Sequence, residues 1–118
     1  MSETMDTCIF CRIAAGTIPS TIVHSDGEFV AFRDIDPKAP IHVLVIPRRH
    51  IDSVNALQGN DAGLIGRMVL AAKGIASAEG IADPGYRLVL NTGPDGGQSV
   101  GHLHLHLLGG RGLGWPPG

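Results

Sequence analysis

The stretch Gly101-His102-Leu103-His104-Leu105-His106-Leu107-Leu108 alternates histidine with leucine from residue 102 to residue 107. Alternate side chains of a β-strand lie on one face, about 7 Å apart. The stretch therefore predicts a strand with three imidazoles on one face and three leucines on the other. Histidines near neutral pH offer a nucleophile, proton carriers and hydrogen-bond donors, which displacement at an anionic phosphorus atom requires. The same row could instead bind a metal ion or form a solvated, histidine-rich face.

Patterns on the N-terminal side of this stretch predict the other elements. Apolar residues at helical spacing predict one long amphipathic helix between Asp61 and Ile81. The segment CIFCRIAAG, which ends on Gly16, predicts a short helix from Thr7 to Ala15. Apolar, β-leaning runs between turn residues predict strands over 21–24, 28–33, 42–46 and 86–90. This order indicates an α+β fold, a mostly antiparallel five-stranded sheet with its long and short helices on one face.

The length and composition favour one folded domain over residues 1–118. The 118 residues are 43% hydrophobic and 17% charged, which suits a single core. We expect a flexible N-terminus over 1–6 and a C-terminal tail over 111–118. The net charge of −2 gives no broad basic field for nucleic acid or an anionic membrane. No apolar run is long enough to span a membrane and the N-terminal MSETMDT is polar, so a cytoplasmic protein is expected.

Several of these segments together resemble the histidine triad (HIT) superfamily. The stretch His102–Leu108 is similar to the family signature, in which three histidines alternate with apolar residues. The resemblance extends to Phe32-Arg33-Asp34-Ile35, Ala39–Pro47, Asn91-Thr92-Gly93, Gly96-Gly97-Gln98-Ser99 and Trp115-Pro116-Pro117-Gly118. The last two segments look more like the Hint branch, the purine nucleoside phosphoramidases, than the dinucleoside polyphosphate hydrolases.

The resemblance implies an activity, an assembly and roles for residues. It implies a hydrolase that cleaves purine nucleoside 5′-phosphoramidates, derivatives of AMP or GMP, without a catalytic cofactor. It also implies a homodimer in which two sheets join into one ten-stranded sheet. His104 would be the nucleophile that forms a nucleotidyl-histidine intermediate, His106 would contact the phosphate, and His42 would be a proton-relay partner.

The resemblance also implies which residues bind the nucleotide. Loop residues would hold the phosphate and leaving group, namely Asn91, Gly97, Gln98 and Ser99. Asp34 would bind the ribose hydroxyls, with Ile35 beside the sugar. Ile9, Phe10 and Phe32 would enclose the purine, although apolar residues at such positions more often belong to a core. Trp115 would reach the active site of the partner subunit.

The two cysteines form a Cys8-x-x-Cys11 pair that could hold a metal ion. With His50 and His102 they could complete a tetrahedral Cys₂His₂ set for structural zinc. Some branches of the superfamily bind structural zinc in these places, and other Hint-like proteins lack the cysteines. A redox pair and two reduced, buried thiols are the alternatives.

Three other functions remain open at this point. One is a dinucleoside polyphosphate hydrolase or nucleotidyl transferase of the same superfamily. Another is a nucleotide-binding regulatory protein whose turnover is incidental. The last is a metal enzyme that uses His102, His104 and His106 as ligands, which predicts that a chelator abolishes activity.

Overall fold

Five antiparallel strands form one sheet in the order β1-β2-β3-β5-β4. The structure is a computed structural model that describes residues 7–118, so the flexible N-terminus expected over 1–6 lies outside the described residues. The elements are α1 (Ile9–Ala14), β1 (Ile22–Ser25), β2 (Phe29–Arg33), β3 (Ile41–Pro47), α2 (Ala62–Ala78), β4 (Tyr86–Val89) and β5 (Leu105–Gly109). Two short 3₁₀ turns, Val54–Ala56 and Gly59–Asp61, lead into α2. Within residues 7–118, no helix has the length and apolarity needed to cross a membrane.

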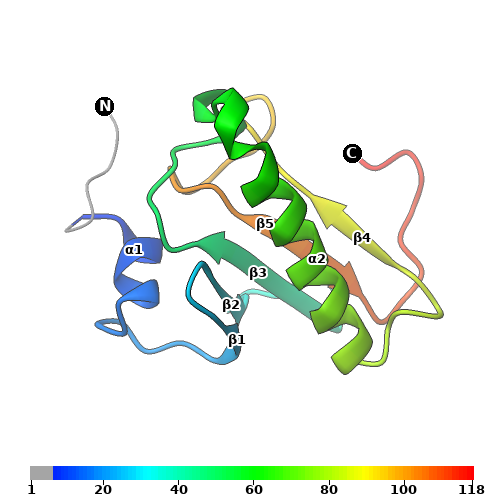
Figure 1. Ribbon diagram of the computed structural model, residues 1–118. Helices are drawn as coiled ribbons and strands as arrows, with labels where there is room; N and C mark the ends of the chain where they lie inside the picture. The colour runs from blue at the N-terminus through cyan, green and yellow to red at the C-terminus, as the bar shows by residue number, and fades with distance from the viewer. Residues whose placement is uncertain (1–6) are drawn as a thin grey trace.

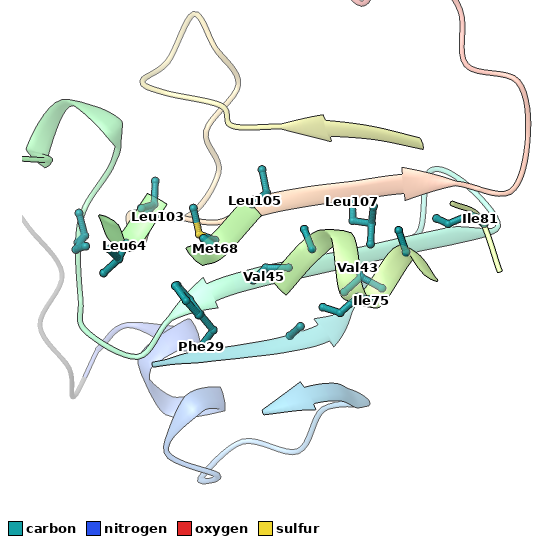
Figure 2. Close-up of a cluster of buried hydrophobic side chains, with 14 residues drawn as sticks. Phe29, Val43, Val45, Leu64, Met68, Ile75, Ile81, Leu103, Leu105 and Leu107 are labelled. Atoms are coloured by element: carbon teal, nitrogen blue, oxygen red, sulfur yellow. The ribbon is translucent and has the colours of Figure 1, made fainter. Parts of the chain in front are cut away.

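One face of the sheet packs against α2, which crosses in front of β3 and β5 in Figure 1. Leu103, Leu105 and Leu107 are buried in this layer together with Met68 and Ile75 of α2 (Figure 2). The expected alternation is therefore confirmed, because the leucines enter the core and the histidines face away from it. Apolar burial of this kind contributes about 25 cal/mol per Å² of surface removed from water, so this layer stabilises the fold.

The opposite face of the sheet packs against α1, so the expectation that both helices lie on one face was wrong. Phe10 and Ile13 of α1 are buried with Phe32 of β2 and with Leu44 and Ile46 of β3. The physical reason lies in β2 and β3, whose apolar residues are consecutive instead of alternating. Strands that are apolar on both faces need a covering layer on each side.

The strand predicted over 102–108 is regular only from Leu105 onward. Pairing between β3 and β5 ends at Val45 and Leu105, and β3 itself ends at Pro47. The N–H of Leu103 instead donates to the carbonyl of Ile51, over 2.6 Å. His102 and His104 therefore lie on an extended segment that precedes β5 and is anchored to the chain beyond β3.

Candidate functional site

A cavity of about 290 Å³ lies on the face of the sheet that carries α1. Eight of the predicted site residues line it, namely Ile9, Phe10, Phe32, Asp34, Ile35, Ser99, His104 and His106. They come from α1, from β2 and the turn that follows it, and from the segment 99–106. The fold thus brings together residues that lie almost one hundred positions apart in the sequence.

His104 is the most deeply buried histidine of the cavity wall, at 5% exposure. Its Nδ1 lies 2.7 Å from the carbonyl oxygen of His102, and a carbonyl can only accept, so Nδ1 carries the proton. Nε2 is then the unprotonated nitrogen, with a lone pair free for a substrate. Burial also lowers the pKa of His104, which keeps the ring neutral and nucleophilic near pH 7.

His106 is linked to His42 by a hydrogen bond whose direction follows from the backbone. The N–H of Lys38 donates to Nδ1 of His42 over 3.0 Å, so the proton of His42 must be on Nε2. That Nε2–H donates to Nδ1 of His106 over 2.9 Å. His106 in turn carries its proton on Nε2, so this ring presents an N–H donor. One backbone amide therefore sets the protonation pattern of both rings.

Burial keeps this pair of histidines neutral. It lowers the pKa of His42, and it lowers the pKa of His106 to about 4, where repulsion from His104 and His42 in their protonated forms acts in the same direction. Asp34 opposes the shift in both rings, since its Oδ2 lies 3.5 Å from Nε2 of His42. The site near neutral pH thus holds uncharged imidazoles with defined donor and acceptor nitrogens.

The walls of the cavity are mainly apolar. The rings of Phe10 and Phe32 meet edge to face with centroids 5.4 Å apart, and Phe10 meets His104 in the same way at 5.1 Å. Asp34 lies at the edge of this apolar region, with Oδ1 accepting from the N–H of Asp36. Ile35 is 98% exposed and contributes only to the rim. Such a cavity suits a flat apolar group joined to a polar one.

The loop between β4 and β5 reaches the cavity through Ser99 and Val100. Asn91, Gly97 and Gln98 are absent from the lining. The N–H of Gly97 donates to the carbonyl of Pro94 and that of Gln98 donates to the carbonyl of Gly93. These two amides therefore close the loop on itself, and Ser99 is the predicted loop residue that the fold places at the cavity.

Cys8, Cys11, His50 and His102 come together beside the cavity, with their ligand atoms within 4.8 Å of one another. Nε2 of His102 donates to the carbonyl of Pro47, and Nε2 of His50 donates to the carboxylate of Asp52. The lone pairs on the two Nδ1 atoms are thereby left facing the thiols, at Nδ1–Sγ distances of 3.2 to 3.4 Å. Carbonyl and carboxylate partners of this kind orient metal-binding histidines in proteins.

The three histidines of the 102–106 segment do not form a common metal site. His102 points its lone pair toward the cysteines, whereas His104 uses Nδ1 on the carbonyl of His102. Asp34, His42 and His106 lie close enough to be considered as ligands, but His42 directs an N–H, not a lone pair, toward the others. The geometry thus disfavours a metal enzyme built on the histidine row.

Several cavity residues were missed by the sequence analysis. They are Ile13, Ile18, Pro19, Ser20, Arg33, Leu44 and Val100. Leu44 could have been found, because it lies two residues after His42 in a strand and so shares its face. Ile18, Pro19 and Ser20 follow α1 in a segment without a periodic pattern, and no signal in the sequence places them at the site.

Comparisons with known proteins identify relatives that match this chain over most of its length. The family model described as "Scavenger mRNA decapping enzyme C-term binding" matches residues 7–112. An uncharacterised HIT-like protein of Synechococcus elongatus is 51% identical over 118 residues, covering 100% of both chains. Protein HitA of Neisseria gonorrhoeae is 49% identical over 105 residues, covering 89% of this chain and 97% of that one.

Solved structures show the same relationship. A HIT family hydrolase from Legionella pneumophila superposes with a TM-score of 0.93 at 51% identity, covering 95% of this chain and 100% of that one. A histidine triad nucleotide-binding protein from Candida albicans has a TM-score of 0.79 at 30% identity, covering 93% and 83%. The chain therefore belongs to the histidine triad (HIT) superfamily.

Proposed function

We propose that this protein hydrolyses purine nucleoside 5′-phosphoramidates to the nucleoside monophosphate and the free amine. The observation that carries the proposal is the hydrogen bond from Nδ1 of His104 to the carbonyl of His102, which leaves the lone pair of Nε2 available at the cavity. The names of the relatives support the coarser part, since one is a hydrolase and another a nucleotide-binding protein. The apolar walls beside His104 suit a purine base.

The reaction would proceed in two displacements at the α-phosphorus. The Nε2 lone pair of His104 forms a bond to phosphorus while the phosphorus–nitrogen bond breaks, and the amine leaves with that electron pair and takes up a proton. It would leave toward Ser99, which lies at an exposed part of the cavity where water can supply the proton. Water then forms a bond to phosphorus while the bond to Nε2 breaks, the electron pair returns to His104, and the proton of the attacking water passes to solvent. Splitting one difficult step into two is the advantage of covalent catalysis.

His106 and Asp34 would act on different parts of the substrate. The Nε2–H of His106, set by His42, would donate to a phosphoryl oxygen as negative charge develops there. This donor is a neutral ring, because the lowered pKa of His106 means that it takes up a second proton only near pH 4 and below. The Oδ2 of Asp34 would accept from the ribose hydroxyls, since Oδ1 is held by the backbone.

Single-turnover hydrolysis of adenosine 5′-phosphoramidate tests this proposal. We expect His104→Ala to lower the rate at least about a thousandfold, because the nucleophile is removed. A chelator should have no direct effect on the chemical step. His24→Ala is the matched control, because it removes a histidine of β1 that does not line the cavity. Mass spectrometry of quenched enzyme should detect one nucleotidyl group on wild type and none on His104→Ala.

Two results would redirect the assignment. Faster cleavage of diadenosine polyphosphate than of the phosphoramidate would favour the dinucleoside polyphosphate hydrolases of the same superfamily. Tight AMP binding with no turnover of either substrate would favour a nucleotide-binding regulatory protein. Turnover by His104→Ala equal to wild type would refute the histidine nucleophile.

We further propose that Cys8, Cys11, His50 and His102 hold a structural zinc ion. Two thiols and two imidazole lone pairs are a donor set that zinc favours, and a tetrahedral zinc site places sulfur and nitrogen ligands about 3.6 Å apart. The Nδ1–Sγ distances of 3.2 to 3.4 Å are close to that value. When bound, zinc would link Cys8 and Cys11, at the start of α1, to the segments that follow β3 and precede β5.

Metal analysis of protein purified without chelators tests this second proposal. We expect about one equivalent of zinc, and Cys11→Ser should lose most of it because one of four ligands is weakened. Less than a tenth of an equivalent in the wild-type protein would refute the site. A thermal melt with and without chelator should show a lower melting temperature for the metal-free protein.

A homodimer is the third part of the proposal. β4 is an edge strand with one unpaired side, and such edges pair readily with a second copy. The outward face of α2 adds an apolar stripe, with Leu70 62% exposed between Gly66 and Gly74. Trp115, 83% exposed in the C-terminal tail, would contact the partner's cavity. Sedimentation should give twice the chain mass, and Leu70→Lys should shift it toward the monomer.

A further inference from the structure

Gln98 holds the loop between β4 and β5 in place through all of its side-chain groups. Its Oε1 accepts from the N–H of Gly93 over 3.1 Å, within the loop. Its Nε2 donates to the carbonyl of Val100 over 3.0 Å and to the carbonyl of Asp52 over 2.7 Å. The last bond ties the loop to a segment 46 residues earlier in the chain. The side chain is therefore an anchor, with no donor left over for a ligand.

The side-chain bonds of Gln98 restrict a loop whose glycines have wide conformational freedom. Gly93 and Gly97 have φ values of 71° and 78°, a region that glycine adopts at little steric cost. The loop's own hydrogen bonds, from Gly97 to Pro94 and from Gln98 to Gly93, are both local. Gln98 thus ties the loop, and with it Ser99, to the segment that contains Asp52, in addition to the packing of Val100 against the α1 side of the sheet.

Asp52, whose carbonyl accepts the hydrogen bond from Gln98, is also linked to the cysteine cluster. Its Oδ1 accepts from Nε2–H of His50 over 2.8 Å, and this bond holds Nδ1 of His50 at 3.2 Å from Sγ of Cys11. Asp52 therefore serves two sites, the cluster through its carboxylate and the loop through its backbone carbonyl. The intervening residue, Ile51, is buried, and its carbonyl accepts from the N–H of Leu103 between His102 and His104.

We propose that the segment 50–52 couples metal occupancy of the cysteine cluster to nucleotide affinity at the cavity, with Asp52 and Gln98 as positioning residues. A metal on His50 fixes that ring, the ring fixes the Asp52 carboxylate, and the Asp52 carbonyl then holds Gln98 and the loop. This inference rests on the proposed nucleotide binding and the proposed metal site. It adds that the two binding events stabilise each other.

A thermodynamic cycle on the full-length wild-type protein tests the coupling without any assay of turnover. Calorimetry gives the AMP affinity of the zinc-loaded and metal-free forms, and competition with a chromophoric chelator gives the zinc affinity with and without saturating AMP. We expect zinc to tighten AMP binding about fivefold or more, and AMP to tighten zinc binding by the same factor, since linkage is reciprocal.

Gln98→Glu tests the path, because it keeps the shape of the side chain and removes both donors. The coupling factor, which is the ratio of AMP affinities with and without zinc, should fall toward one in this variant. Zinc affinity without AMP should change less than about twofold. Asn55→Asp is the matched control, since it makes the same chemical change at an exposed residue nearby and should retain the wild-type factor. Asp52→Ala should weaken zinc binding itself about tenfold or more.

The possible failures can be told apart. If AMP binds neither form, the proposed function fails and the coupling fails with it. If zinc does not bind, the metal site and the coupling are both refuted while AMP binding can stand. If both bind independently in the wild-type protein, only the coupling is overturned. A Gln98→Glu protein that is folded and keeps the full factor would refute the path through Gln98.

Discussion

The free energy of unfolding should fall on acidification from neutral to mildly acidic pH, and replacing His106 with glutamine should make that fall smaller by about 2 kcal/mol. In the folded protein, burial and the neighbouring His104 and His42 lower the pKa of His106 from 6.5 to about 4. A difference of about 2.5 pKa units corresponds to at most about 3.4 kcal/mol. Because His106 is partly exposed, about 2 kcal/mol is the value we expect.

The sign follows from which state binds the proton. The unfolded chain protonates His106 as the pH falls below 6.5, whereas the folded chain resists protonation until about 4. The contribution of His106 to stability is therefore complete above 6.5 and is lost as the pH falls toward 4. Glutamine does not titrate in this pH range, so the variant should not show the loss of stability that protonation of His106 causes.

Urea unfolding followed by circular dichroism, at about pH 7.5 and about pH 4.5, measures the effect. Wild type and His106→Gln are compared at the same metal content, and the difference between the two pH values is taken for each protein. The difference should be smaller by about 2 kcal/mol in the variant. An equal loss of stability in both proteins on acidification would show that His106 is not a buried, neutral group in the folded protein.

Three further changes test other parts of the site and fold. Phe32→Leu removes the edge-to-face contact with Phe10 and should weaken AMP binding about 3- to 10-fold in calorimetry, with little effect on the chemical step. His42→Ala leaves Nδ1 of His106 and the N–H of Lys38 without their mutual partner, and should lower single-turnover rates about 10- to 100-fold with AMP affinity less affected. Met68→Ala, at a position with 0% exposure in the α2 layer, should cost about 2–5 kcal/mol in urea unfolding while turnover per folded molecule stays unchanged.

Periodicity in the sequence predicted most of the fold and part of the site. The alternation of histidine and leucine identified which side chains enter the core, and helical spacing located α2. The Cys8-x-x-Cys11 spacing indicated a metal-binding pair that His50 and His102 could complete, and the fold does bring these four residues together. These features are local or chemically distinctive, so they are visible without knowing the tertiary structure.

Other features depend on contacts between distant segments and could not be predicted in this way. The position of α1 on the second face depends on the burial of β2 and β3 on both sides. The consecutive apolar residues of these strands indicated that both faces are covered, but not which element covers each face. The role of Gln98 is set by the carbonyl of Asp52, a backbone atom that has no signature in the sequence. The start of β5 likewise depends on where its pairing with β3 ends, at Val45 and Leu105.

The central strand β3 contributes alternate side chains to the two opposite faces of the sheet. Val43 and Val45 face the α2 layer, whereas Leu44 and Ile46 pack on the α1 side, where His42 meets His106. Substitutions on the valine side of this strand change the packing against α2 and do not touch the side chains that face the cavity. Libraries that randomise only Val43 and Val45 should therefore yield folded proteins that differ in stability and keep the geometry of the cavity.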